Sequence, residues 1–238
     1  MPFDANTSRI AVRNLHAFYG ESHVLHGIDI DIKRGELVSL LGRNGAGKTS
    51  LLRAIVGTLI TRKGEIYIDN TRVDSLPAFK IARMGIGYVP EERGIYSSLS
   101  VYENLTLPPV LKPGGLSLSE IYLLFPNLAE RGSTPGTKLS GGEQQMLAIA
   151  RILRTGADLI FLDEPTEGLA PAIVDQIGVA LNVLKSRGFT IVLVEQNISF
   201  AVEFADRHYV LDEGKIVDQF VRAQADERID QLVKYLTV

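Results

Sequence analysis

The sequence contains no cysteine, and this absence removes two kinds of chemistry. Without cysteine the chain has neither disulfides nor thiolate metal ligands, which fits a reducing compartment. A large excess of one charge is also missing, because 25 lysine and arginine residues are balanced by 28 aspartate and glutamate residues, leaving a net charge of −3. No global basic field therefore indicates a nucleic-acid partner.

Long hydrophobic runs are missing as well. No apolar stretch of the sequence reaches the roughly 18 residues that a membrane-spanning helix needs. Polar residues come early, at Asp4, Asn6, Thr7 and Ser8, so the first residues lack the apolar core of a signal peptide. We therefore expect a soluble, cytoplasmic protein whose contact with any membrane would come through a partner. The 238 residues, 45% of them hydrophobic, are enough to bury a substantial core.

A glycine-rich segment at residues 42–49 is the strongest local signal. It follows the apolar run 38–41 and precedes the helical pattern 50–56, so a buried strand is predicted to end in a turn that opens a helix. Glycines let backbone N–H groups converge on an anion, and a helix N-terminus adds unpaired donors and partial positive charge. Lys48 can reach the β- and γ-phosphates of a nucleotide, and the Thr49 hydroxyl can bind Mg²⁺. The predicted phosphate-binding residues are Gly42, Arg43, Asn44, Gly45, Ala46, Gly47, Lys48, Thr49 and Ser50.

Four further strands are predicted in the first 90 residues. Residues 10–15 alternate well enough for one strand, and residues 27–32 alternate more strictly, with three isoleucines on one face. Tyr19 lies in the turn between these two and can be either a core or turn aromatic or a ring that stacks on a nucleotide base. Residues 64–69 predict a short strand of antiparallel type, and residues 86–89 predict a strand in the centre of its sheet.

The pattern becomes helical between about residues 91 and 155. Ser-x-x-Glu capping boxes open helical patterns at Ser100 and Ser117, and a loop rich in proline and glycine separates them at 108–115. We interpret this region as a helical subdomain inserted into an α/β core rather than as a separate domain.

The segment 139–145, Leu-Ser-Gly-Gly-Glu-Gln-Gln, contains a third capping box, from Ser140 to Glu143, and apolar residues follow it at helical spacing. One interpretation is a helix that begins with a glycine-rich entry. Gly141 and Gly142 also leave bare backbone donors at a helix N-terminus, which makes a second anion-binding surface. One phosphate-binding loop needs no second cradle unless a nucleotide site is shared with a partner.

An apolar run at 159–162 ends in Asp163 and Glu164. Such a run predicts a parallel strand covered on both faces, and open α/β sheets bind ligands at the carboxyl ends of such strands. Because neighbouring side chains on a strand point in opposite directions, we expect different roles for the two carboxylates. Asp163 is placed to hold Mg²⁺ through water, and Glu164 to orient or deprotonate an attacking water. Solvated acids at a strand end are common, but here an upstream P-loop requires an acidic partner for its metal.

The remaining chain continues the α/β pattern. A helix is predicted from Pro171 to about Arg187, followed by a buried strand at 191–194 and a hairpin turn at 212–214. A last helical pattern has four apolar residues on one face, which favours packing against the core over binding a partner: Ile229, Leu232, Val233 and Leu236. The histidines show no metal-ligand spacing and receive no functional role: His16, His23, His26 and His208.

Three motifs in this order, at 42–49, 139–145 and 159–165, resemble the nucleotide-binding subunit of an ATP-binding cassette (ABC) transporter. The resemblance covers essentially the whole chain, and the motif at 139–145 is close to diagnostic of the superfamily. It implies a single α/β nucleotide-binding domain with a P-loop, a mostly parallel central sheet, an antiparallel β edge and an inserted helical subdomain. The implied boundaries are a RecA-like core at about 1–90 and 156–238, and a helical subdomain at about 91–155.

One branch of the superfamily is most similar, the LivF-type subunit of branched-chain amino acid importers. The segments that carry this likeness are 88–91, 167–171 and 194–197. Glu91 stands where most superfamily members have a glutamine that senses the γ-phosphate and the membrane subunit. Ala170 stands where the loop after the acidic strand usually has an aspartate. Gln196 stands where most members have the switch histidine.

The LivF-type branch generally shows these three replacements. Gln196 cannot be protonated, so it would reach a γ-phosphate only by hydrogen bonding. A site that binds nucleotide without hydrolysing it is one interpretation of these departures. An active ATPase is favoured because four central residues are intact: Lys48, Thr49, Asp163 and Glu164.

The resemblance implies that two subunits sandwich two ATP molecules head to tail. The second subunit would be a related, LivG-like ABC ATPase or another copy of this chain. Tyr19 would stack on adenine, and Mg²⁺ would be held by Thr49 and Asp163, with Glu91 as a further candidate ligand. The implied catalytic residues are Glu164, Lys48 and Gln196. The residues implied to contact the partner's ATP are Ser140, Gly141, Gly142 and Gln144.

The resemblance also implies membrane partners, namely two integral membrane permease subunits and, indirectly, a periplasmic or extracellular substrate-binding protein. The surface at 91–107, with Tyr96 and Leu99 expected to be exposed, resembles the groove that receives a coupling helix from the membrane subunit. The chain would then lie on the cytoplasmic face of the inner membrane, attached through these partners.

Other functions stay open at this point. The cargo could be urea, short amides or other amino acids, because absent subunits select it. A soluble ABC-type ATPase with an assembly or switching role, or a nucleotide-binding scaffold without hydrolysis, would use the same fold. DNA-repair cassettes are disfavoured because they place a long coiled coil between P-loop and signature, where this chain has about 90 residues.

Overall fold

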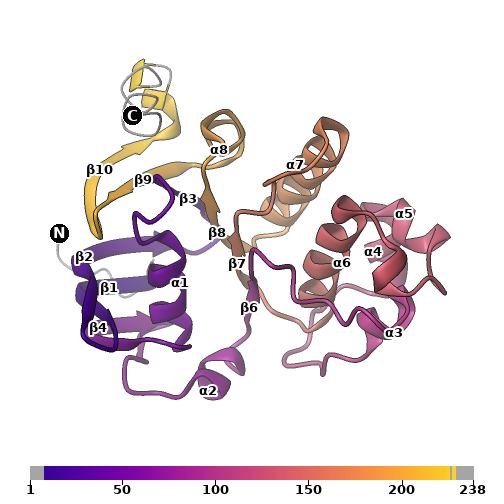
Figure 1. Cartoon of the computed structure of the whole chain (residues 1–238), viewed down its shortest axis with the longest axis horizontal. Coiled ribbons are helices and arrows are strands. Elements are labelled where there is room, and N and C mark those ends of the chain that lie inside the picture. The colour runs from indigo at the N-terminus through magenta and orange to yellow at the C-terminus, as the bar shows by residue number, and fades with distance from the viewer. Residues whose placement is uncertain (1–7, 226, 229–238) are drawn as a thin grey trace.

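The structure, a computed structural model, describes residues 8–225, 227 and 228 (Figure 1). The strands are β1 (Ser8–Tyr19), β2 (Ser22–Lys33), β3 (Leu37–Leu41), β4 (Thr61–Ile68), β5 (Thr71–Arg72), β6 (Ile86–Val89), β7 (Leu159–Asp163), β8 (Thr190–Glu195), β9 (Arg207–Asp212) and β10 (Lys215–Val221). The helices are α1 (Lys48–Val56), α2 (Ala78–Ala82), α3 (Val101–Thr106), α4 (Leu118–Leu124), α5 (Pro126–Glu130), α6 (Gly141–Arg154), α7 (Pro171–Ser186) and α8 (Ile198–Phe204), with 3₁₀ turns η1 (Gly136–Lys138) and η2 (Arg222–Gln224). The last predicted helix, with Ile229, Leu232, Val233 and Leu236, lies outside the described residues.

A six-stranded sheet forms the centre of the molecule, in the order β10-β9-β3-β8-β7-β6. Its strands pair in parallel except for β10, which pairs antiparallel with β9 at one edge. Every residue of β3, β7 and β8 is buried, which is why these strands read as continuous apolar runs. The predicted α/β fold with a mostly parallel sheet and an antiparallel edge is confirmed.

One strand prediction is wrong. The segment Ile86–Val89 forms β6 at the edge of the sheet, paired with β7 alone among the described strands, and not at its centre. The apolar pattern arises because helices cover this edge strand: Ile86 contributes to the core beneath α1, and Val89 to the core beneath α6. Burial by helices and burial between strands give the same sequence pattern.

A second sheet is antiparallel, in the order β2-β1-β4-β5, and its inner face packs on α1. The turn between β1 and β2 is also shorter than the predicted one, because Tyr19 still belongs to β1 and only Gly20 and Glu21 connect the strands. Gly20 has a φ of +58°, a left-handed conformation that glycine adopts without strain.

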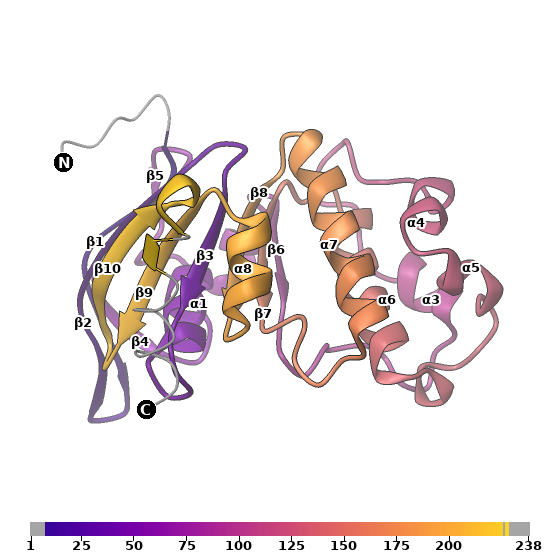
Figure 2. The same cartoon turned by 90° about the horizontal axis from the view of Figure 1, so that it is seen from above.

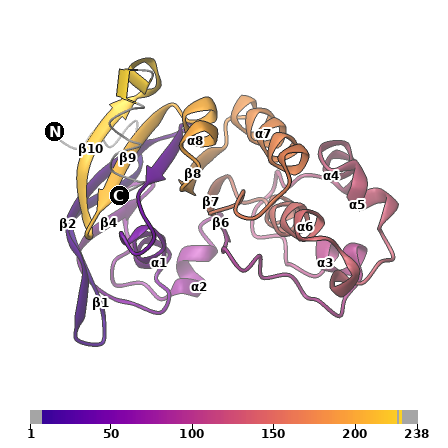
Figure 3. The same ribbon diagram turned by 45° about the horizontal axis from the view of Figure 1, so that its top comes forward.

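Helices α3 to α6 lie between β6 and β7 in the chain and form the end of the molecule opposite the antiparallel sheet (Figures 1 and 2). The three capping boxes predicted at Ser100, Ser117 and Ser140 are all present, each with reciprocal side-chain and backbone hydrogen bonds. Pro171 is the first residue of α7, as predicted, and α7 runs alongside α6 (Figure 3). Between β6 and β7, helices α3, α4 and α6 therefore each begin at a capping box, whereas α5 begins with Pro126 and has no side-chain cap.

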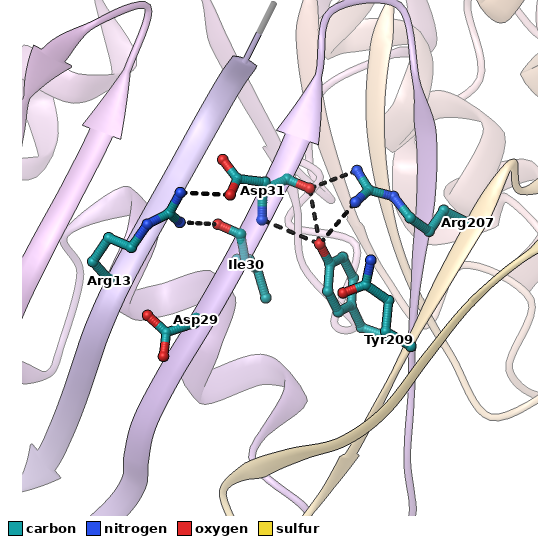
Figure 4. Close-up of a pocket in the computed structure, with 7 residues that line it drawn as sticks. Arg13, Asp29, Ile30, Asp31, Arg207 and Tyr209 are labelled. Atoms are coloured by element: carbon teal, nitrogen blue, oxygen red, sulfur yellow. Dashed lines mark hydrogen bonds and ion pairs between the residues drawn. The ribbon is translucent and has the colours of Figure 1, made fainter. Parts of the chain in front are cut away.

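A polar network joins the two sheets around a cavity of about 460 Å³ (Figure 4). The Arg207 guanidinium donates to the Asp31 carbonyl oxygen at 2.6 Å and pairs with Glu36 at 2.7 Å. The Tyr209 hydroxyl donates to the same carbonyl at 2.9 Å, and Arg13 pairs with the Asp31 carboxylate. Since both arginines that line this cavity already have oxygen partners, the network serves to fix the sheets against each other.

Candidate functional site

The turn between β3 and α1 is shaped by glycines that no larger residue can replace without displacement. A Cβ on Gly42 would lie 2.4 Å from the carbonyl oxygen of Leu211, and a Cβ on Gly47 would lie 2.9 Å from the Leu25 side chain. Gly45 and Gly47 also have φ angles of +82° and +107°. Within the described chain no side chain caps α1, so the backbone N–H groups of its first turn face the loop as anion donors.

Lys48 is held inside this loop. Its Nζ donates to the carbonyl oxygens of Gly42 at 2.7 Å and Arg43 at 3.1 Å, and it forms an ion pair with Glu164 Oε1 at 3.1 Å. Only 3% of the lysine side chain and 8% of the glutamate side chain are exposed. A buried ammonium at the start of an uncapped helix is suited to a polyanionic ligand.

Asp163 ends β7 next to the start of α1. Its Oδ1 accepts a hydrogen bond from the Thr49 hydroxyl at 3.1 Å, and its Oδ2 accepts one from the Tyr88 hydroxyl at 3.0 Å. Burial raises the pKa of Asp163, and the hydrogen bonds from Tyr88 and Thr49 oppose that rise. A carboxylate beside a hydroxyl supplies the hard oxygen atoms that Mg²⁺ prefers.

Glu164 does not continue the strand. We predicted different roles for Asp163 and Glu164 from the alternation of side chains along a strand, and that reason is wrong. Strand β7 ends at Asp163, and Glu164 has a φ of +50°, in the left-handed region that few non-glycine residues adopt. Its backbone N–H donates to the Val194 carbonyl at 3.0 Å, which anchors it to β8. The two acids still face different partners: Asp163 contacts Thr49, and Glu164 contacts Lys48.

Gln196 connects three loops at this edge of the sheet. Its Nε2 donates to Glu164 Oε2 at 2.6 Å and to Asn44 Oδ1 at 2.6 Å. Since β3, β7 and β8 run parallel, their carboxyl ends bring these side chains together although 152 residues separate Asn44 from Gln196. The amide therefore bridges the glycine-rich loop and the acid after β7.

A cavity of about 230 Å³ opens above these residues, and Glu91 lies on its wall. Its lining residues are Val24, Arg43, Asn44, Gly45, Gly47, Lys48, Thr49, Ser50, Glu91 and Glu164. Tyr19 lies beside α1, with its hydroxyl 3.3 Å from an Arg53 guanidinium nitrogen and 3.5 Å from the Ser50 hydroxyl. Most residues of the first motif thus line one cavity together with Glu164. Asp163 and Tyr19 do not line it, but their side chains contact the lining residues Thr49 and Ser50.

The second glycine motif lies apart from that cavity. Gly142 packs so closely that a Cβ would be 2.8 Å from Ile173, and a Cβ on Gly141 would be 3.2 Å from the Arg93 guanidinium. Gln144 accepts a hydrogen bond from Arg93 at 2.9 Å and donates to the Gly136 carbonyl at 3.1 Å. The motif is a tightly packed, capped helix start, and none of its residues lines the 230 Å³ cavity in the described part of the chain.

The four histidines lie in two places. His16, His23 and His26 gather on the β1–β2 hairpin, with His16 Nδ1 and His23 Nε2 3.0 Å apart. Even so, no group of three or more His, Cys, Asp or Glu residues among those described is arranged to hold a metal ion. His208 is buried, stacks on Phe220 and bonds to Ser39.

Sequence reasoning missed several contacts at this site. Tyr88 belongs to a predicted strand and to the segment 88–91, but neither indicates its bond to Asp163, 75 positions away. Arg93 was not singled out, although it bonds to Gln144 of the second motif. Glu195, at the end of β8, is buried beside Gln196 and appears in the sequence analysis only within the segment 194–197. No local pattern marks these residues, because each contact depends on how distant strands and loops pack.

Comparisons with known proteins agree on one family. A family model described as "ABC transporter" matches residues 25–167. The chain is 41% identical to the high-affinity branched-chain amino acid transport ATP-binding protein BraG of Pseudomonas aeruginosa, over 84% of this chain and 87% of that one. It is 36% identical to a probable branched-chain amino acid transport ATP-binding protein, LivF, of Archaeoglobus fulgidus, over 85% and 87% of the two chains.

Solved structures give the same fold. An ATP-binding cassette of an ABC transporter in its ADP conformation superposes with a TM-score of 0.81 at 22% identity, covering 96% of this chain and 98% of that one. A dimeric bacterial ABC transporter cassette superposes with a TM-score of 0.77 at 29% identity, covering 90% and 98%. With a P-loop, an acidic strand end and a capped signature helix on this fold, the chain belongs to the ABC transporter family, as one of its ATP-binding cassettes.

Proposed function

We propose that this chain is the ATP-hydrolysing subunit that energises an importer of branched-chain amino acids. The observation that carries the proposal is the convergence of Lys48, Glu164 and Gln196 beside the Thr49–Asp163 pair. An ATPase needs a cation for the phosphates, oxygen ligands for a metal and a carboxylate near the attacking water, and this edge of the sheet has all three. The cargo is proposed from the relatives, since BraG and LivF are described as branched-chain amino acid transport proteins.

The glycine-rich loop would hold the phosphates of ATP. Residues 42–50 supply backbone donors and Lys48, and Tyr19 would stack on adenine from the end of β1. Lys48 now pairs with Glu164, so phosphate binding would replace one partner of the ammonium with another. That exchange would release Glu164 toward the γ-phosphate side, where it orients the attacking water and accepts its proton.

Thr49 and Asp163 fit a Mg²⁺ ion, since their oxygen atoms are 3.1 Å apart and belong to the hydroxyl and carboxylate classes that magnesium prefers. When bound, Mg²⁺ would neutralise charge that develops on the phosphates. Tyr88 keeps the second oxygen of Asp163 occupied, which orients the first toward Thr49. Glu91 lines the same cavity and is a further candidate ligand. Gln196 would bond to the γ-phosphate while it remains close to Glu164.

The signature residues would complete a partner's site. Ser140, Gly141, Gly142 and Gln144 lie away from this chain's own cavity, so they would contact ATP bound to a second subunit placed head to tail. A related cassette is known as a dimer, which supports this arrangement. The second subunit would be a LivG-like ATPase or another copy of this chain. The proposed boundaries are a RecA-like core at about 1–90 and 156–238 and a helical subdomain at about 91–155.

Two integral membrane subunits, with a substrate-binding protein acting through them, would complete the transporter. No helix in the described residues is long and apolar enough to cross a bilayer, so attachment at the cytoplasmic face would run through these subunits. An apolar groove of about 410 Å³ between α1, α2, β6 and α6 is suited to an apolar helix, and Phe79 on its wall is 58% exposed. The docking surface predicted from the sequence, at 91–107, is a different one, since none of its residues lines this groove. On that surface Tyr96 is exposed and Leu99 is half-buried.

The test is transport in a strain that lacks this chain. Uptake of radiolabelled leucine, isoleucine and valine should fall and return with the wild-type chain, but not with Lys48→Ala. Glutamine and urea uptake serve as controls, because the chain is also 33% identical to a Bacillus subtilis glutamine transport ATP-binding protein. Loss of glutamine or urea uptake, with branched-chain amino acid uptake intact, would reject the proposed cargo.

A further inference from the structure

Glu195 is a buried carboxyl group that the roles proposed above do not use. It ends β8, and only 2% of the residue is exposed. Its Oε1 accepts hydrogen bonds from the Thr166 backbone N–H at 3.2 Å and from the Thr166 hydroxyl at 2.8 Å. Its Oε2 accepts from the backbone N–H groups of Gln196 at 3.2 Å and Asn197 at 3.3 Å. One side chain therefore ties the loop after β7 to the loop after β8.

These two loops carry the groups proposed for hydrolysis. Glu164 begins the first loop and Gln196 begins the second, and their side chains meet at 2.6 Å. Glu164 holds a left-handed backbone conformation, with a φ of +50°, that a non-glycine residue keeps only when its surroundings enforce it. Thr166, which donates to Glu195, lies two residues beyond Glu164, and the other donor is the backbone N–H of Gln196 itself. Glu195 therefore holds the backbone on both sides of the contact between Glu164 and Gln196.

A buried carboxylate is a costly way to join two loops if stability is the only requirement. Its desolvation is unfavourable, and hydrogen bonds to a charged acceptor must offset it. What the carboxylate provides is two oxygen atoms on one rigid group, each accepting from a different loop, which fixes the spacing between those loops. This is the kind of contact that orients a neighbouring reactive group.

We propose that Glu195 is a positioning residue for ATP hydrolysis, which holds the loops after β7 and β8 so that Gln196 meets Glu164. The inference deepens the proposed function and rests on it, because it assumes that Glu164 and Gln196 act on ATP. Glu195 itself does not line the 230 Å³ cavity proposed to hold the phosphates. Its effect should therefore fall on turnover rather than on ATP binding.

The charge state of Glu195 gives a distinctive readout. Burial raises its pKa to about 7, although the hydrogen bonds from Thr166, Asn197 and Gln196 favour the charged form. The groups that act on this carboxyl, among the described residues, are the Thr166 hydroxyl and three backbone amides, none of which titrates near neutral pH. Protonation turns one acceptor oxygen into a donor that faces other donors. The tether should thus weaken, and turnover decline, as the pH falls through about 7.

The experiment compares the full-length wild-type chain with Glu195→Gln, with whichever partner subunit its ATPase activity requires. The kcat and KM for Mg-ATP are measured from about pH 5.5 to about pH 8.5, together with the Kd for ATP. Glu195→Gln should lower kcat about 10-fold or more at the high end, leave KM and Kd within about two-fold, and remove the acid limb near pH 7. Glu203→Gln, which changes an exposed acid on α8, is the matched control and should change none of these values.

A second variant covers loss of folding. Thr166→Val removes one hydroxyl donor and keeps the backbone, so it should lower kcat less than Glu195→Gln, and the double variant should be no worse than Glu195→Gln alone. Wild-type kcat and an unchanged pH profile in both single variants would overturn the inference. So would a fall in ATP affinity that matches the fall in kcat. If the wild-type assembly itself hydrolyses no ATP, the proposed function fails, and that result is distinguishable from either outcome.

Discussion

Removing Lys48 should affect ATP binding and stability separately. The lysine is buried, pairs with Glu164 at 3.1 Å, and also donates to two carbonyl oxygens of the glycine-rich loop. Hydrogen bonds to charged groups contribute about 2 kcal/mol, so Lys48→Ala should weaken ATP binding by about 30-fold. Isothermal titration of the purified chain with Mg-ATP measures this directly.

The same substitution leaves a buried carboxylate without its cation. Breaking a buried ion pair costs about 3–5 kcal/mol, and we expect about 3 kcal/mol because Glu164 keeps its hydrogen bond from Gln196. Urea denaturation without nucleotide should show this loss of unfolding free energy. The double variant Lys48→Met with Glu164→Gln removes both charges and should regain most of the stability. ATP binding within about two-fold of wild type, with the free energy of unfolding changed by less than about 0.5 kcal/mol, would show that Lys48 contributes to neither.

Three further predictions concern other parts of the chain. Gly47→Ala should lower the free energy of unfolding by about 2 kcal/mol in urea denaturation, because Gly47 has a φ of +107° and its new Cβ would lie 2.9 Å from the Leu25 side chain. Gly45→Ala should lower this free energy less, because a Cβ there would have nothing within 4 Å. Burial lowers the pKa of His208 in the folded chain to about 4. Between about pH 6.5 and pH 4 the imidazole is therefore protonated in the unfolded chain but not in the folded chain, so the free energy of unfolding should decrease as the pH falls through this range. In His208→Gln the free energy of unfolding, measured by urea denaturation at several pH values, should no longer show this dependence on pH. An unchanged dependence would contradict the role given to His208. Phe79→Asp should prevent co-purification with membrane subunits while ATP affinity stays within about two-fold, and undiminished co-purification would exclude the apolar groove as the docking site.

Contiguous motifs were the most predictable part of the site. The glycine-rich turn, the capped helix starts and the apolar runs of β3, β7 and β8 depend on neighbours within a few residues, so the sequence pattern carries them. The conformation of Glu164 was not predictable, since nothing in a run of apolar residues shows that the strand ends one position earlier.

Long-range pairing was the least predictable part. The edge position of β6 depends on strand order, and a buried edge strand covered by helices has the same composition as a central one. The bonds of Tyr88 to Asp163 and of Gln196 to Asn44 join residues 75 and 152 positions apart. Glu195 carries no local signal for the same reason, because its hydrogen bond from Thr166 forms only when β7 and β8 lie side by side.

We propose that Glu164 handles the attacking water in an ATPase site built on Lys48, Thr49 and Asp163. The most direct test of this role is the rate of Mg-ATP hydrolysis by Glu164→Gln, measured beside ATP binding and the mass of the assembly by size-exclusion chromatography with light scattering. We expect turnover at least about 100-fold below wild type, with ATP still bound and the chain held in an ATP-dependent dimer. Turnover within about two-fold of wild type would contradict this role.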